Sequence, residues 1–129
     1  MNVDIRPATA DDELAVRRLL DGAMLETGDI RGQIEADAVL VAVDSANRVH
    51  GTLVFESRGH GVHITAIAVR RTRRDQGIGT ALVEAVAPAD GTVTATFDDR
   101  VRPFYQSVGF ECESIDTERW RGVRSKERR

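Results

Sequence analysis

Hydrophobic and polar residues alternate along this chain with two different periods, which predict strands and helices in turn. Short apolar or alternating runs, typical of strands, occupy residues 3–6, 39–43, 49–56, 62–69, 92–97, 110–115 and 118–124. Apolar residues three and four positions apart are typical of helices and predict them at residues 10–24, 30–36, 77–86 and 101–108. The first helix carries Leu14, Val16 and Leu20 on its predicted apolar face.

The connections between these runs predict a mixed sheet. Turn residues at 44–48 and 58–61 join three consecutive strands as hairpins, which implies antiparallel pairing. The helix between Val69 and Thr92 is a crossover, and a crossover joins parallel strands. Apolar residues on both faces of strand 62–69, at its C-terminal end, are typical of a central strand. We therefore expect an α/β (α+β) fold with a mixed, mostly antiparallel central sheet.

Two glycines mark the start of the helix at residue 77. Gly77 and Gly79 lie where backbone N–H groups have no helical partner and where the helix dipole is positive. Phosphate is often bound at such helix starts, and glycine lets a ligand approach the backbone closely because it has no Cβ. An ordinary tight turn is the alternative interpretation. The absence of a following Gly-Lys-Ser/Thr excludes the usual nucleoside-triphosphate loop.

Length and composition limit the remaining choices. The chain has 129 residues, which suits one domain, expected at residues 1–124, followed by a polar tail at 125–129. No apolar run reaches the ~20 residues of a membrane span, and the N-terminus lacks a signal-peptide pattern. We therefore expect a cytoplasmic protein. Cys112 is the only cysteine, so no internal disulfide is possible, and His50, beside a turn, has no predicted role.

Two motifs resemble those of a known family. The stretch Arg74-Asp-Gln-Gly-Ile-Gly79 resembles the Arg/Gln-x-x-Gly-x-Gly/Ala signature of the GNAT family of N-acetyltransferases, and a strand ending Ala66–Val69 precedes it. Downstream, Phe104–Phe110 (Phe-Tyr-Gln-Ser-Val-Gly-Phe) is similar to the second signature of that family. The resemblance covers nearly the whole chain, although the N-terminal third matches only in its pattern of elements. It implies a single-domain acetyl-CoA acyltransferase fold, with helices on both faces of the sheet.

The resemblance also implies acetyl-CoA as the co-substrate and no metal. The loop Arg74–Thr80 would wrap the pyrophosphate with backbone N–H groups, and the backbone of Ile67–Val69 would bind the pantetheine arm. In the family the central strand and its neighbour splay apart to admit the cofactor. Asp98 stands where the family often has Asn, and an ionised Asp accepts but does not donate a hydrogen bond. The implied cofactor-binding residues are Ile67, Ala68, Val69, Arg74, Asp75, Gln76, Gly77, Ile78, Gly79, Thr80 and Asp98.

The expected reaction is direct attack of a primary amine, on a small molecule or on a protein or peptide, at the thioester carbonyl. Tyr105 matches the family's tyrosine, which protonates the departing thiolate as a general acid. A core aromatic residue is the alternative for Tyr105, although Phe104 and Phe110 suit the core better. No carboxylate lies on strand 62–69, so His63 is the candidate base, Glu56 is the alternative, and a water chain is equally open.

Other function classes stay open from the sequence. A catalytically weak or inactive acyl-CoA-binding regulatory module fits the missing strand carboxylate and Asp98. The arginines at residues 70–74 could mark a nucleic-acid adaptor. However, the net charge is −3 and no aromatic residues interleave with the arginines, so we expect neither a nucleic-acid nor a membrane partner. A monomer and a homodimer are both compatible with the sequence.

Overall fold

A computed structural model describes residues 3–22, 29–59, 61–73, 77–87 and 91–125. Within these residues the strands form a seven-stranded sheet in the order β1-β2-β3-β4-β5-β7-β6. The strands are β1 (Asp4–Pro7), β2 (Val39–Val43), β3 (Val49–Arg58), β4 (Gly61–Val69), β5 (Thr92–Asp98), β6 (Glu111–Ser114) and β7 (Arg119–Ser125). The helices are α1 (Glu13–Gly22), α2 (Ile30–Glu35), α3 (Ile78–Val86) and α4 (Arg102–Ser107), with 3₁₀ turns η1 (Ala10–Asp12), η2 (Arg71–Arg73) and η3 (Asp99–Val101). The predicted mixed fold is confirmed. The 3₁₀ turn η2 was not predicted, and residues 23–24 of the first predicted helix lie outside the described residues.

The chain divides into two compact units. One unit contains residues 1–55 and 66–85, and the other contains residues 56–65 and 86–129. Strands β3 and β4 contribute residues to both units, because each changes unit part-way along its length. The second unit also contains Ser125, which pairs with Thr92 at the end of β7. The division into a domain at 1–124 and a tail at 125–129 stays a prediction, and residues 126–129 lie outside the described part of the chain.

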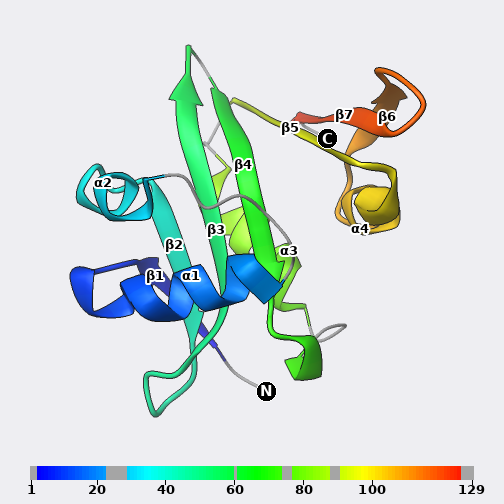
Figure 1. Ribbon diagram of the computed structural model, residues 1–129. Helices are drawn as coiled ribbons and strands as arrows, with labels where there is room; N and C mark the ends of the chain where they lie inside the picture. Colours follow the sequence, from blue (N-terminus) through cyan, green and yellow to red (C-terminus); the bar gives the residue numbers. More distant parts are fainter. Residues whose placement is uncertain (1–2, 23–28, 60, 74–76, 88–90, 126–129) are drawn as a thin grey trace. The chain divides into compact units, whose positions relative to one another are not determined.

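In the first unit, helices cover both faces of the sheet (Figure 1). Antiparallel pairing places Val39 beside Val54, and both pack beneath α1 and α2. On the other face, β3 meets α3 so closely that a Cβ on Gly51 would lie 2.9 Å from Cγ2 of Ile78. The core beneath α1 and α2 comprises Ala8, Val16, Leu20, Ile30, Ile34, Val39, Val41, Val43, Val49, Val54, Ala66 and Ala68.

The predicted apolar face of the first helix is correct for two of the three residues named above. Val16 and Leu20 are fully buried, whereas the side chain of Leu14 is 59% exposed. A helix turns about 100° per residue, so Leu14 lies about 160° around the axis from Val16. That geometry places Leu14 on the opposite face, and its assignment to the core was wrong.

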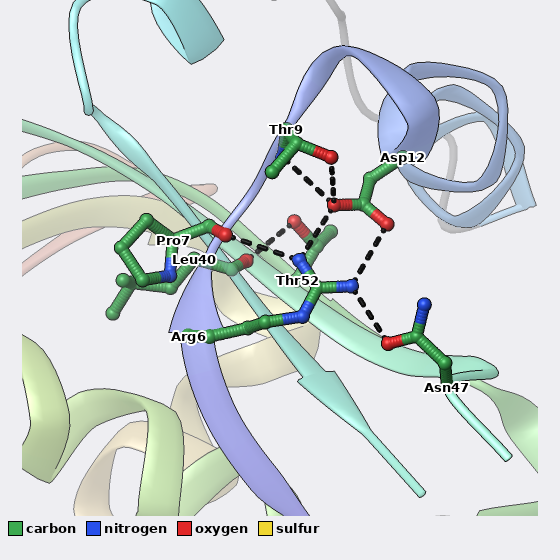
Figure 2. Close-up of polar contacts among 7 residues, drawn as sticks. All are labelled: Arg6, Pro7, Thr9, Asp12, Leu40, Asn47 and Thr52. Atoms are coloured by element: carbon green, nitrogen blue, oxygen red, sulfur yellow. Dashed lines mark hydrogen bonds and ion pairs between the residues drawn. The ribbon is translucent and has the colours of Figure 1, made fainter.

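A polar network ties β1 to the start of α1 and to the β2–β3 turn (Figure 2). The guanidinium of Arg6 donates to both carboxylate oxygens of Asp12, at 2.8 and 3.2 Å, and to Oδ1 of Asn47 at 2.9 Å. The same carboxylate accepts from the backbone N–H of Thr9 at 2.8 Å, which satisfies a helix-start donor. The Arg6 contact is the first cause that holds the pKa of Asp12 below its usual value.

The second unit is built around parallel and antiparallel pairing on the two sides of β5. The segment Val62–Ile64 of β4 runs parallel to Val93–Ala95, and β5 pairs along its whole length with antiparallel β7. Helix α4 supplies aromatic side chains to the core of this unit. Gly122 of β7 permits close packing there, because a Cβ at this position would lie 3.0 Å from the Phe97 ring and 3.1 Å from the Phe110 ring.

Candidate functional site

The backbone at Gly77 has a conformation that favours glycine. Its φ angle is +82°, in the left-handed region that side-chain-bearing residues rarely adopt. A Cβ at this position would meet no atom within 4 Å, so packing does not require the glycine. Helix α3 begins at the next residue, Ile78, which is buried, while Thr80 is exposed. The start of α3 therefore has open space beside a glycine, as an approaching ligand needs.

The other members of the predicted loop are only partly described. Gly79 is buried in the first turn of α3. Arg74, Asp75 and Gln76 lie outside the described residues. The structure thus describes the helical half of the motif, and the preceding half stays a prediction from the sequence.

The predicted pantetheine-binding segment lies at the C-terminal end of β4. The ladder between β4 and β5 joins Val62–Ile64 to Val93–Ala95, and it stops before Ile67–Val69 is reached. Alternate side chains of this end, Ala66 and Ala68, pack into the core beneath α1 and α2. Within the predicted segment the side chain of Ala68 is therefore used for packing, while Ile67 and Val69 are half-buried.

Tyr105 lies in the aromatic core of the second unit. Its ring stacks on Phe97 with centroids 4.1 Å apart and meets Phe104 and Phe110 edge-on, each at 5.1 Å. The residue is 4% exposed, whereas Phe104 is only half-buried. The expectation that Phe104 suits the core better was wrong, because α4 directs Tyr105 between Phe97 and Phe110. Burial raises the pKa of Tyr105 well above its usual value, with Cys112 adding to the effect.

Asp98 is engaged in a local structural role. Its carboxylate accepts from the backbone N–H of Arg100 at 2.9 Å and caps the 3₁₀ turn η3. The same oxygen lies 3.2 Å from Nε of Arg100. These contacts hold the pKa of Asp98 below its usual value, with the backbone hydrogen bond as the largest cause. The carboxylate is therefore ionised at neutral pH and only accepts hydrogen bonds.

The two candidate bases lie in the second unit with different surroundings. Nδ1 of His63 is 2.7 Å from Oγ1 of Thr94 on the neighbouring strand. Burial lowers the pKa of His63, and the charge of Arg58 lowers it further, against an opposing effect of Glu56. The Glu56 carboxylate itself forms an ion pair with Arg58. His63 is therefore neutral at physiological pH, while Glu56 is occupied by a cation.

Comparison with known protein families identifies the fold. A family model described as "Acetyltransferase (GNAT) domain" matches residues 35–112, more than half of the chain. The chain belongs to the GNAT family of acetyltransferases. The match includes β4, the glycines at the start of α3, and the helix that carries Tyr105. A search of curated protein sequences finds no significant match.

Solved structures share this GNAT fold at low sequence identity. A GNAT acetyltransferase from Bacillus cereus is 14% identical, with a TM-score of 0.80 over 99% of this chain and 100% of that chain. Ard1 from Thermoplasma volcanium is 17% identical, with a TM-score of 0.78 over 99% and 100%. The PaiA N-acetyltransferase from Thermoplasma acidophilum, in complex with coenzyme A, is 12% identical, with a TM-score of 0.74 over 98% and 100%.

The described residues contain no group of three or more His, Cys, Asp or Glu side chains that could hold a metal ion. No helix in the described ranges has both the length and the apolar character needed to cross a membrane.

Two further residues shape this GNAT domain and were assigned no structural role from the sequence. Arg70 is anchored to β3 through its backbone and its side chain. His50, to which no role was assigned, is a strand residue that is 97% buried and bonded to Asp44 at 2.8 Å. It lies at an irregularity in the ladder between β2 and β3, and a hydrophobic pattern does not reveal an irregularity of this kind. A polar residue inside an apolar run, as in Val49-His50-Gly51, was the available signal.

Proposed function

We propose that this GNAT member transfers an acetyl group from acetyl-CoA to a primary amine by direct attack. The observation that carries the proposal is the geometry of Gly77, with its positive φ and open surroundings at the start of α3. Backbone N–H groups at a helix start bind phosphate. The location of this glycine within a GNAT sequence match supports coenzyme A as the source of that phosphate. The acceptor is a small-molecule amine or a protein or peptide amine.

The donor would bind through two backbone segments. The N–H groups of Gly77–Thr80, with Arg74, Asp75 and Gln76 before them, would hold the pyrophosphate, and Ile67–Val69 would bind the pantetheine arm. PaiA from Thermoplasma acidophilum, which shares the fold, was solved with coenzyme A. Asp98 would contribute little to cofactor binding, because its carboxylate already caps η3.

Tyr105 would assist departure of the coenzyme A thiolate. Since burial raises its pKa, the phenol keeps its proton at every physiological pH. A phenol with a raised pKa is a weaker acid than the coenzyme A thiol that would form if it gave its proton to the thiolate. Its contribution is therefore a hydrogen bond that stabilises the thiolate, rather than complete proton transfer.

His63 is the better of the two candidate bases. A neutral imidazole accepts a proton, and the lowered pKa of His63 keeps it neutral over a wider pH range. The Glu56 carboxylate is already engaged in an ion pair with Arg58. Proton removal by a water chain remains the alternative.

Direct attack on the thioester is favoured over an acyl-cysteine intermediate. Cys112 is the only cysteine, and burial raises the pKa of its thiol, although Arg102 opposes the shift. A thiol with a raised pKa supplies little of the thiolate that acts as the nucleophile.

Calorimetric titration with acetyl-CoA, followed by a thiol-release assay across an amine panel, tests the proposal. We expect acetyl-CoA to bind and thiol release to depend on an added amine. Absence of acetyl-CoA binding would contradict the proposal outright.

A binding module without catalysis is the second candidate. The observation that favours it is that two carboxylates predicted to take part in the site already form ion pairs, Glu56 with Arg58 and Asp98 with Arg100. Acetyl-CoA binding with no thiol release for any amine would select this candidate. Turnover that disappears in a His63→Ala variant would select the enzyme.

A further inference from the structure

Three consecutive residues of β3 form an irregularity in the sheet of the first unit. Val49 pairs with Val43 and Gly51 pairs with Ala42, which are neighbours in β2. His50 is therefore an extra residue in the ladder, a β-bulge. Bulges bend a strand, redirect its side chains and occur next to functional sites more often than chance predicts.

The bulge holds Arg70, the first residue after β4, at two points. The backbone N–H of Arg70 donates to the carbonyl oxygen of His50 at 2.7 Å. Its Nη2 donates to the carbonyl oxygen of Val49 at 3.1 Å. Both the main chain and the side chain of Arg70 are thereby fixed to β3.

The next residue of the bulge supports the start of α3. A Cβ added to Gly51 would lie 2.9 Å from Cγ2 of Ile78 and 3.2 Å from Cδ1 of Leu82. Real Cβ atoms essentially never approach other heavy atoms so closely, so even alanine at Gly51 would displace Ile78 or β3. Ile78 is the first residue of α3 and is itself 3% exposed. Val49–Gly51 thus contacts Arg70, which precedes the predicted phosphate motif, and Ile78, which lies within it.

The imidazole of His50 fixes the bulge from within the protein. The residue is 3% exposed, and its Nε2 lies 2.8 Å from Oδ2 of Asp44. An ionised carboxylate only accepts hydrogen bonds, so Nε2 carries the proton. The other oxygen of Asp44 accepts from the backbone N–H groups of Ala46 and Arg48, at 2.8 and 3.0 Å. These contacts, with that from His50 the largest, lower the pKa of Asp44 to about 2.

The hydrogen bond to Asp44 uses only one of the two ring nitrogens of His50. Its Nδ1 is buried and has no hydrogen-bond partner among the described residues. A buried polar atom without a partner is destabilising, so stability alone does not account for a histidine here. An amide side chain could make the same hydrogen bond to Asp44.

We propose that the His50 bulge positions the donor-binding segment of this GNAT domain, with His50 as a positioning residue. The inference rests on the proposed function, because it assigns the chain between Arg70 and Ile78 to acetyl-CoA. Asp44 orients His50, the Val49 and His50 carbonyls fix Arg70, and Gly51 seats Ile78. The bulge acts on the nucleotide end of the donor without touching it.

Two variants and two ligands test this inference. His50→Leu removes the hydrogen bond to Asp44, and Gly51→Ala pushes on Ile78. Coenzyme A binding is measured by calorimetry, and binding of pantetheine, which lacks the pyrophosphate, by chemical-shift titration. We expect about tenfold weaker coenzyme A binding in each variant, about 1.4 kcal/mol, and pantetheine affinity unchanged within about twofold (about 0.4 kcal/mol).

Controls separate positioning from loss of stability. His50→Gln keeps a donor for Asp44 and should restore coenzyme A affinity, and the amide of Arg70 should exchange with solvent faster in His50→Leu than in His50→Gln. Gly22→Ala is the matched control for Gly51→Ala, since a Cβ at Gly22 meets no atom within 4 Å. It should leave both affinities unchanged.

Two results would overturn the inference. Wild-type affinity for coenzyme A in both variants would do so, and so would an equal loss for coenzyme A and pantetheine, which indicates general destabilisation. If the His50→Leu protein fails to fold, Arg70→Ala is tested in its place. We expect the same loss of coenzyme A affinity, with pantetheine affinity unchanged. If the wild-type protein binds no coenzyme A, the proposed function fails first, and this result is seen before any variant is made.

Discussion

The start of α3 and the helix that carries Tyr105 are held in place by different means. Around Gly77 the structure depends on backbone conformation and on hydrogen bonds, with a positive φ at Gly77 and with Arg70 bonded to two carbonyl groups of β3. Around Tyr105 it depends on ring packing against Phe97 and Phe110. A change in the first region should therefore impair ligand binding, whereas a change in the second should mainly affect stability.

Truncation of the Tyr105 ring is the largest expected effect and tests the packed region. We expect Tyr105→Ala to lower the free energy of unfolding by about 3–5 kcal/mol, as is typical for a buried aromatic residue. Urea denaturation followed by circular dichroism measures the change. Phe104→Ala is the matched control, and it should cost less because Phe104 is only half-buried. Equal losses would show that Tyr105 does not hold the aromatic core together.

A charge at Gly77 tests the backbone-built region. Gly77→Glu places a side chain and a negative charge where the phosphate is proposed, at a φ of +82°. We expect acetyl-CoA affinity to fall about a hundredfold or more, roughly 2.7 kcal/mol, as measured by calorimetry. Gly77→Asn is the control, since Asn tolerates positive φ and adds no charge. It should retain most of the affinity, and unchanged binding by the Glu variant would remove the loop from the site.

Removal of the Tyr105 hydroxyl separates its chemical role from its packing role. Tyr105→Phe keeps the ring and so should keep the free energy of unfolding within about 0.5 kcal/mol. Turnover should fall about tenfold to a hundredfold, because a hydrogen bond to a charged group contributes about 1.5–3 kcal/mol. Acetyl-CoA affinity should not change. A wild-type rate in this variant would leave Tyr105 with packing alone.

The two regions also differ in how far the sequence predicted them. The glycine motif specifies backbone conformation directly, so the helix was predicted from residue 77, one residue before its observed start at Ile78. The crossover from β4 to β5 was also predicted correctly, from the helix between the two strands. The burial of Tyr105 was not, because three aromatic residues in one short segment compete for the same core. Which of the three rings is buried depends on packing against Phe97 and Gly122, which are distant in sequence. The bulge at His50 was missed for a related reason, since only the pairing of Val43 with Val49 reveals the extra residue.

The smallest expected effect concerns the polar network of the first unit and its sensitivity to acid. The pKa of Asp12 is lower in the folded protein than in the unfolded chain, because Arg6 and Thr9 bond its ionised form. Its contribution to stability is therefore complete above about pH 4, close to the unfolded value. The contribution is lost as the pH falls through the lower folded value. The aromatic core around Tyr105 has no comparable carboxylate in its ring contacts and should not share this sensitivity.

Asp12→Asn should consequently lower the free energy of unfolding at pH 7 by about 1 kcal/mol and reduce its dependence on pH below about pH 4. Urea denaturation at several pH values measures both quantities. Asp11→Asn is the matched control, because Asp11 is exposed and has no side-chain contact within the described part of the chain. Stability that decreases in acid equally in the Asp12 variant and in the wild type would show that the Arg6–Asp12 pair is not the source. The acid sensitivity would then be assigned to Asp44, whose contact with His50 lowers its pKa in the same direction.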